Sequence, residues 1–203
     1  MTVFSSTGRM MFAAAAATSL AGCGINSVPT AEENAKAKWA DVQAAFQERA
    51  NLIPNLAAVA KGAAEQEKEI LTGVIEARAK ATSVQLNADD LTDPAKMAQF
   101  QAAQNQLSGS LAGLGRLLVN VERYPELKSI TNYQMLQSQL EGQENRIRVA
   151  LRDYNGAVQS YNTTIRTFPD AIGAKIFYGA KPMVPYQAVT PGAEVAPSLE
   201  GKL

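Results

Sequence analysis

The residue most able to carry chemistry in this sequence is its single cysteine, Cys23, which closes the leucine–alanine–glycine–cysteine run of residues 20–23. Arg9 and an apolar, alanine-rich stretch over residues 10–22 precede it. A short basic segment, a short apolar segment and then small residues are typical of a secretory signal peptide. Because a cysteine directly follows the small residues, the pattern predicts a bacterial lipoprotein signal over residues 1–22. Cys23 would then become the new N-terminus and carry acyl chains such as palmitate.

The predicted anchor places the mature chain on a membrane surface that faces away from the cytoplasm. The apolar stretch, residues 10–22, is shorter than the roughly 20 residues that a bilayer-spanning helix needs. Two or more acyl chains hold a protein firmly at a membrane. No aspartate follows Cys23 in the next positions, which favours the outer membrane if the bacterium has two. The alternative is a secreted protein in which the match to a lipidation signal is accidental.

The absence of histidine from the sequence excludes several kinds of catalysis. Histidine is the usual general base near neutral pH and a common metal ligand. We therefore predict no catalytic residues, no metal, no cofactor and no enzymatic activity. A hydrolase with paired carboxylates needs no histidine and is the least favoured alternative. Basic and acidic residues balance at 19 each, so nothing indicates binding to nucleic acid.

Two tyrosine–asparagine pairs are the first candidate binding surface. Tyr154-Asn155 and Tyr161-Asn162 repeat at an interval of seven residues, so both pairs lie on one side of one helix. They could form an aromatic and polar strip that binds a ligand or a partner. The favoured interpretation is that the tyrosine rings pack in the core while their hydroxyls find partners.

Asn51 and Asn55, on either side of Pro54, are the second candidate surface. Proline removes a helical hydrogen bond, so these amides could bind a ligand in a groove opened by a kink. We favour the interpretation that they satisfy the freed backbone groups or cap a restarted helix. Three aspartates within residues 89–93 could bind calcium, but their spacing favours turn residues and a helix cap. The apolar residues of 172–178 are predicted to cover the end of the core, with membrane or partner contact as the alternative.

The elements that must position these residues are all predicted to be helices. Apolar residues recur at intervals of three and four, as in helices that pack side by side in a coiled coil or bundle. Three long helices are expected: 31–81 with a kink or break near Pro54, 94–124 and 132–168. Thr30 is expected to cap the first of them and Asp93 the second. Further expectations are a loop over 82–92 and short helices over 125–130 and 171–178.

This pattern predicts an all-α fold, an elongated antiparallel up-and-down four-helix bundle with a kinked first helix. The expected parts of the chain are a signal peptide (1–22), a tether with the lipidated cysteine (23–30), the bundle (31–180) and a disordered tail (181–203). The tail prediction depends on its four prolines and few large apolar residues.

The chain resembles the LemA family of bacterial envelope proteins over most of residues 38–177. Four blocks carry the resemblance in order: Leu52-Ile53-Pro54-Asn55-Leu56; Glu67-Lys68-Glu69 with Glu76-Ala77-Arg78-Ala79-Lys80-Ala81; Tyr124-Pro125-Glu126-Leu127-Lys128; and Glu144-Asn145-Arg146-Ile147 with Tyr154-Asn155, Tyr161-Asn162 and Phe168-Pro169. The resemblance implies a kinked antiparallel four-helix bundle with an N-terminal membrane anchor and no established enzyme activity. Many members look as if they keep a transmembrane helix, whereas this chain has the lipidation signal.

The sequence therefore favours a lipid-anchored, non-enzymatic helical protein with a structural or protein-interaction role in the envelope. Its expected partners are the membrane, through the anchor, and envelope proteins that the sequence does not identify. The alternative is a sensor that binds a small molecule or peptide in a groove near Pro54.

Overall fold

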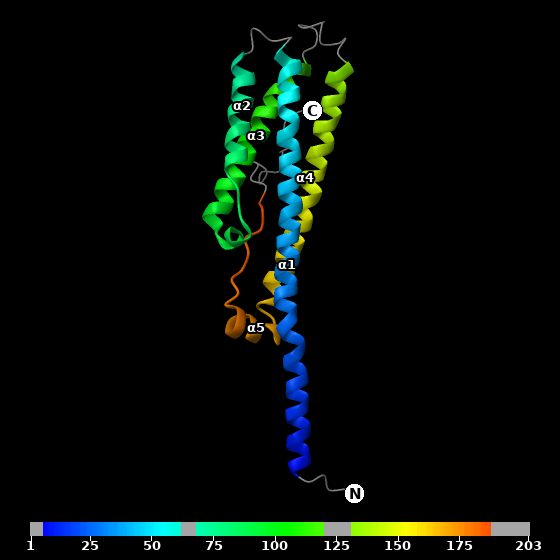
Figure 1. Ribbon diagram of the computed structural model, residues 1–203, viewed down its shortest axis with the longest axis vertical. Coiled ribbons are helices and arrows are strands. Elements are labelled where there is room, and N and C mark those ends of the chain that lie inside the picture. The colour runs from blue at the N-terminus through cyan, green and yellow to red at the C-terminus, as the bar shows by residue number, and fades with distance from the viewer. Residues whose placement is uncertain (1–5, 62–67, 120–130, 188–203) are drawn as a thin grey trace, which may run out of the picture. The chain divides into compact units, whose positions relative to one another are not determined.

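The computed structural model describes residues 6–61, 68–119 and 131–187, and these residues form helices and connecting segments without a strand among them (Figure 1). The elements are α1 (Ser6–Lys61), α2 (Lys68–Ser83), a 3-10 helix η2 (Ala88–Thr92), α3 (Pro94–Val119), α4 (Thr131–Thr164), α5 (Asp170–Gly173) and a π-helical turn η5 (Ala174–Tyr178). The all-α prediction is confirmed. The predicted stop of a helix at 124 and the predicted helix 125–130 lie outside the described residues.

The chain forms two compact units. Unit 1 comprises Met1–Ala44 and Arg148–Pro185, and unit 2 comprises Ala45–Ile147 and Tyr186–Leu203. Helices α1 and α4 are each divided between the two units, with one segment in unit 1 and another in unit 2.

The core of unit 2 is formed by apolar residues spaced at threes and fours, and α2 and α3 lie side by side in it (Figure 1). Such spacing places the apolar residues on one face of each helix, where burial removes them from water. The buried members of this core are Ile53, Leu56, Leu71, Val74, Ala77, Ala81, Leu107 and Leu114.

The predicted single kinked helix over 31–81 is wrong, because the chain reverses within that range. Arg78 Nε in α2 donates a hydrogen bond of 2.8 Å to the Ala50 carbonyl in α1. In one continuous helix, residues 28 positions apart would lie roughly 42 Å from each other. The predicted break at Pro54 is also wrong, since α1 runs through it to Lys61. Burial of apolar residues before and after the proline holds the helix together there. The sequence signal for the reversal was Gly62 with the polar run over residues 65–69, a stretch without large apolar side chains.

In unit 1, α1 extends through residues 23–30, which were predicted to be a tether. The prediction of a non-helical conformation there is therefore wrong. Val28 is fully buried, and the Ser27 hydroxyl donates a hydrogen bond to the Asp170 carboxylate. Thr30 does not cap the helix: its hydroxyl donates to the Asn26 carbonyl at 2.7 Å, as an interior helical residue does. Packing of Val28, together with the high helix propensity of the alanines upstream, outweighs the proline at position 29.

The start of α3 confirms a predicted helix cap. Asp93 Oδ1 accepts hydrogen bonds from the backbone amides of Ala95 at 2.9 Å and Lys96 at 3.3 Å. Such a cap satisfies amides that the first helical turn leaves without partners. The predicted loop before it, 82–92, contains the last two residues of α2 and the helical turn η2.

The prediction of a disordered tail from Lys181 is wrong for residues 181–187. Met183 and Tyr186 in this non-helical segment are buried. Two well-spaced apolar side chains and the segment's own carbonyl groups suffice to pack it, although its composition is rich in proline. The short helix predicted over 171–178 is confirmed as α5 and η5, whereas α4 ends at Thr164, before the predicted residue 168.

Candidate functional site

The tyrosines of the repeated pairs lie on the buried face of α4 in unit 1. Tyr154 is fully buried, and its ring centroid lies 5.0 Å from that of Trp39. Its hydroxyl donates to the Val184 carbonyl at 2.9 Å, and the Tyr161 hydroxyl donates to the Lys181 carbonyl at 3.1 Å. Burial raises the pKa of both phenols. The interpretation that these rings pack while their hydroxyls find partners is confirmed.

Asn162 adds a pair of reciprocal hydrogen bonds to the same chain segment. Its Nδ2 donates to the Met183 carbonyl at 2.8 Å, and the Met183 amide donates to Asn162 Oδ1 at 2.9 Å. The side-chain amide thereby serves both backbone groups of one residue, as a neighbouring strand would. In unit 1, the face of α4 that carries Tyr154, Tyr161 and Asn162 therefore binds residues 181–184 of its own chain.

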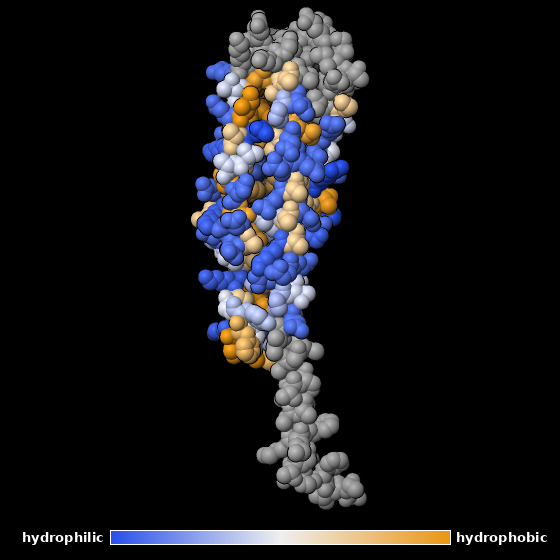
Figure 2. Space-filling view, in the orientation of Figure 1, coloured by the Kyte–Doolittle hydropathy of each residue, from blue (hydrophilic) through white to orange (hydrophobic). Residues whose placement is uncertain are grey.

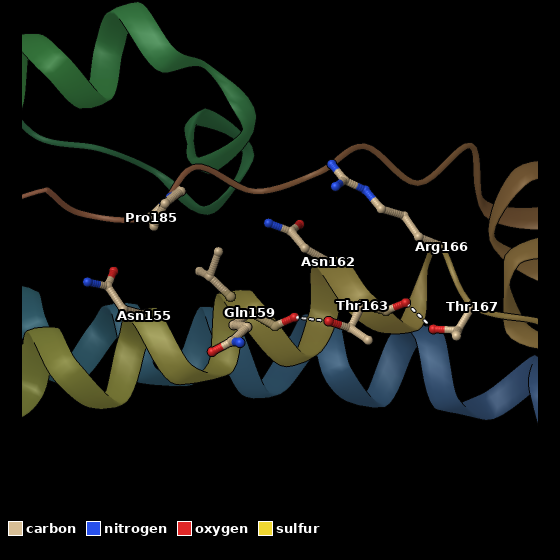
Figure 3. Close-up of a pocket in the computed structure, with 8 residues that line it drawn as sticks. Asn155, Gln159, Asn162, Thr163, Arg166, Thr167 and Pro185 are labelled. Atoms are coloured by element: carbon tan, nitrogen blue, oxygen red, sulfur yellow. Dashed lines mark hydrogen bonds between the residues drawn. The ribbon is translucent and has the colours of Figure 1, made fainter.

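A groove of about 510 Å³ lies beside this contact (Figure 3). Its lining residues are mostly amides and hydroxyls: Asn155, Val158, Gln159, Asn162, Thr163, Arg166, Thr167 and Pro185. Asn155 and Asn162 in α4, and Arg166 in the turn after it, point toward the segment that carries Pro185, whereas Gln159 points away from it (Figure 3). Amide donors and a guanidinium could bind a carboxylate, phosphate or peptide group.

The other predicted amides, Asn51 and Asn55, are exposed on α1 and do not line this groove. Asn51 Oδ1 accepts a hydrogen bond of 2.9 Å from Gln47 Nε2, one turn earlier on the same helix. The predicted role as caps of a restarted helix is wrong, because α1 does not restart at Pro54.

Unit 2 contains a buried charge that the sequence predictions missed. Arg49 in α1 is only 1% exposed. Its guanidinium donates to Gln104 Oε1 at 2.8 Å, Ser108 Oγ at 2.9 Å and Glu144 Oε1 at 2.8 Å. We refer to these four residues as the Arg49 network, which joins α1 to α3 and α4. A buried charge needs such pairing because removal from water is costly.

The Arg49 side chain combines aromatic packing with one nitrogen that lacks a hydrogen-bond partner. The guanidinium carbon lies 5.1 Å from the ring centroid of Phe46, within the range of a cation–π interaction. Arg49 Nε is buried without a hydrogen-bond partner among the described residues. Spacing could have revealed Arg49, because it fills the empty position between Phe46 and Ile53 in the apolar pattern of α1.

The aspartates near η2 have the turn and cap roles that their spacing favoured. Asp90 pairs with Lys96 and accepts a hydrogen bond of 2.9 Å from the Asn87 amide. The Lys96 ammonium, followed by that amide, holds the pKa of Asp90 below its ordinary value. Within the described residues, histidine, cysteine, aspartate and glutamate form no group of three able to hold a metal ion.

An exposed apolar surface lies over α5 and η5 of unit 1 (Figure 2). We call it the α5–η5 patch, and its side chains are between 42% and 73% exposed: Phe168, Ile172, Ile176, Phe177 and Tyr178. The prediction that these residues cover the end of the core is wrong. The small residues Gly173 and Ala174 take the buried positions instead, which leaves the large side chains on the outer face.

The long amphipathic helices define an all-α class of protein, and comparison identifies the family. The LemA family matches residues 38–200, so the chain belongs to the LemA family, as its sequence blocks predicted. It is 26% identical over 158 residues to the magnetosome proteins MamQ 1 and MamQ 2 of Paramagnetospirillum magneticum. It is 27% identical over 157 residues to MamQ of Magnetospirillum gryphiswaldense.

These alignments cover 71% of this chain but only 58% of each relative. The chain therefore matches little more than half the length of these relatives. Among the helices of the described residues, none has a stretch both long and apolar enough to cross a bilayer.

Proposed function

We propose that this LemA-family chain is a lipid-anchored helical protein of the bacterial envelope. Cys23 would attach it to a membrane surface facing away from the cytoplasm, which is the outer membrane if there are two. The observation that carries the proposal is the position of Cys23. It follows the small residues of the predicted lipidation signal and precedes the fully buried Val28 by only five residues, so a lipid there would hold unit 1 directly at the membrane.

The proposed role is non-enzymatic and depends on contacts with other envelope proteins. The two sets of buried polar residues bind groups of the same chain and so are not open to a substrate. Tyr154 and Asn162 bind residues 181–184, and Arg49 binds side chains of α3 and α4. Histidine is absent from the whole sequence. These features favour a role for the outer helical surfaces.

The antiparallel four-helix bundle is part of the same proposal. Within unit 2, Arg49 contacts α3 and α4, and the next residue, Ala50, contacts Arg78 in α2. Contacts between one turn of α1 and three other helices support an arrangement in which four helical segments surround a common core.

Fractionation of the full-length protein and a Cys23→Ser variant tests the anchor. The wild-type chain should stay with membranes through washes with high salt and alkaline carbonate and be released by detergent. The variant should be released by the washes, because the acyl chains supply the binding energy. Equal retention of the two proteins would contradict the proposal.

Crosslinking in native membranes tests the interaction role. Photoreactive residues at exposed positions of α1 and α4, such as Ala40 and Arg152, should give the same crosslinked proteins in repeated experiments. The same residue at the buried Val42 is the control. Failure of the exposed positions to exceed this control would contradict the interaction role and leave the anchor unaffected.

A ligand sensor is the second candidate, and the groove in unit 1 supports it better than Pro54 does. Pro54, Asn51 and Asn55 lie on an exposed side of an unbroken helix, whereas the groove gathers Asn155 and Arg166 around an open volume. A ligand of the folded state must raise its stability. A thermal-shift screen with envelope lipids and muropeptides should therefore raise the Tm of the wild type but not of Arg166→Ala.

A further inference from the structure

In α5 and η5 the large apolar side chains face outward, whereas in a helix that packs on a protein core they face inward. Ile172 and Ile176 are four residues apart and so share one side of the helical turns. That side is exposed, whereas the buried positions hold Gly173 and Ala174. Exposed apolar groups that form one contiguous surface mark a place where another apolar phase makes contact.

The α5–η5 patch lies beside the part of α1 that carries the predicted lipid attachment site. Asp170, which lies within the sequence of the patch, accepts a hydrogen bond from Ser27 in α1. Cys23 is four residues before Ser27 in the same helix, which is about 6 Å along the helix axis. Both parts belong to unit 1. Acyl chains on Cys23 would therefore hold the patch within one or two helical turns of the lipid surface.

Charged residues around the patch suit the headgroups of anionic phospholipids. Arg166, Lys175 and Lys181 are exposed basic residues in this part of the chain. The one acidic residue among them in sequence, Asp170, is engaged by Ser27. An apolar surface with a basic margin is the combination with which interfacial segments bind membranes.

We propose that the α5–η5 patch is a second membrane contact, in which its isoleucine and phenylalanine side chains insert among the headgroups beside the Cys23 anchor. This inference rests on the proposed lipid anchor. The contact would fix the orientation of unit 1 on the membrane, because an acylated cysteine alone leaves the protein free to rotate about it.

Photocrosslinking to lipid tests this contact in the full-length protein. A photoreactive amino acid replaces Phe177, which is 67% exposed, so the substitution leaves the core intact. The matched control replaces Val149, an exposed apolar residue of α4 in unit 1. Val149 lies about 22 Å along the helix from its end at Thr164. After irradiation of native membranes, mass spectrometry of the modified peptides identifies the crosslinked partner and also records whether Cys23 is acylated.

The expected result is a phospholipid adduct at position 177 in several-fold higher yield than at position 149, on a chain that is acylated at Cys23. An acylated chain with equal lipid yields at both positions would overturn the membrane contact and leave the anchor standing. A protein adduct at position 177 would overturn it in favour of a protein partner. A chain without acyl groups would overturn both the anchor and this inference.

Amide hydrogen exchange gives a second, independent readout. In lipid nanodiscs, the amides of residues 170–178 should exchange several-fold more slowly in the acylated wild type than in the Cys23→Ser variant. Identical exchange in the two proteins, with acylation of the wild type verified by mass, would contradict the contact.

Discussion

The two units differ in the polar groups that they bury between their helices. In unit 1, Tyr154 and Asn162 are neutral and bind the backbone of residues 181–184. In unit 2, Arg49 is charged and binds side chains from two other helices. Loss of a neutral hydrogen bond costs about 1 kcal/mol, whereas disruption of a buried ionic group costs several times more. Substitution of Arg49 in unit 2 should therefore lower the stability of the fold more than substitution of Asn162 in unit 1, whose effect should stay local.

Arg49→Ala should have the largest effect. It removes three hydrogen bonds. It also leaves the side-chain oxygen of Gln104, a residue that is only 4% exposed, without its guanidinium partner. We expect a loss of about 2–4 kcal/mol in the free energy of unfolding, measured by urea denaturation.

The exposed ion pair of Arg146 with Glu48, 3.1 Å apart, provides the control for that experiment. Arg146→Ala should cost about 0–1 kcal/mol, because solvent screens exposed pairs. If the two alanine variants are equally stable, the Arg49 network does not hold unit 2 together.

Asn162→Ala should have an intermediate effect confined to the contact in unit 1. It removes both hydrogen bonds with Met183, so about 2 kcal/mol of stability should be lost. The amide of Met183 should lose its protection in hydrogen exchange, while the amides of α3 keep theirs. Gln159→Ala, at an exposed position of the same helix, should change stability by less than about 0.5 kcal/mol. Unchanged protection of Met183 would show that Asn162 does not hold the segment.

The smallest effect should come from the ion pair of Asp90 with the exposed Lys96, and it should depend on pH. Lys96 holds the folded-state pKa of Asp90 below its ordinary value of 3.8. The stabilisation is therefore fully present above pH 3.8 and disappears as the pH falls further, through the lowered pKa. Lys96→Met should have a slightly lower urea midpoint than the wild type at neutral pH, and the difference should close in that acidic range. A difference that stays constant down to the lowest pH would exclude this pair as its origin.

The helices and the packing of the tyrosines could be predicted because they depend on local spacing. Apolar intervals of three and four residues indicated α3 and α4, and the seven-residue repeat placed Tyr154 and Tyr161 on one buried face. The same spacing held the signal for Arg49 and Gln104, which interrupt two apolar stripes and meet each other in the structure.

Other features depend on contacts that spacing does not encode. The apolar pattern has a gap between Val59 and Ile70 that includes the polar run over residues 65–69, but a gap alone does not show whether the chain turns there or continues as an exposed stretch of helix. The order of residues 181–187 depends on their backbone carbonyls, which every sequence has, and on two buried side chains, Met183 and Tyr186. The α5–η5 patch was misplaced because an amphipathic pattern shows that a helix has an apolar face but does not show which phase that face meets.

The mass of the mature N-terminus tests the lipid anchor most directly. The full-length protein is isolated from the membranes of its own host or of a related bacterium, digested, and its N-terminal peptide measured by mass spectrometry. A peptide that begins at Cys23 and carries the added mass of several acyl groups is the predicted result. A mature protein that retains residues 1–22, or one in which Cys23 is unmodified, would contradict the lipid anchor on which the proposed function rests.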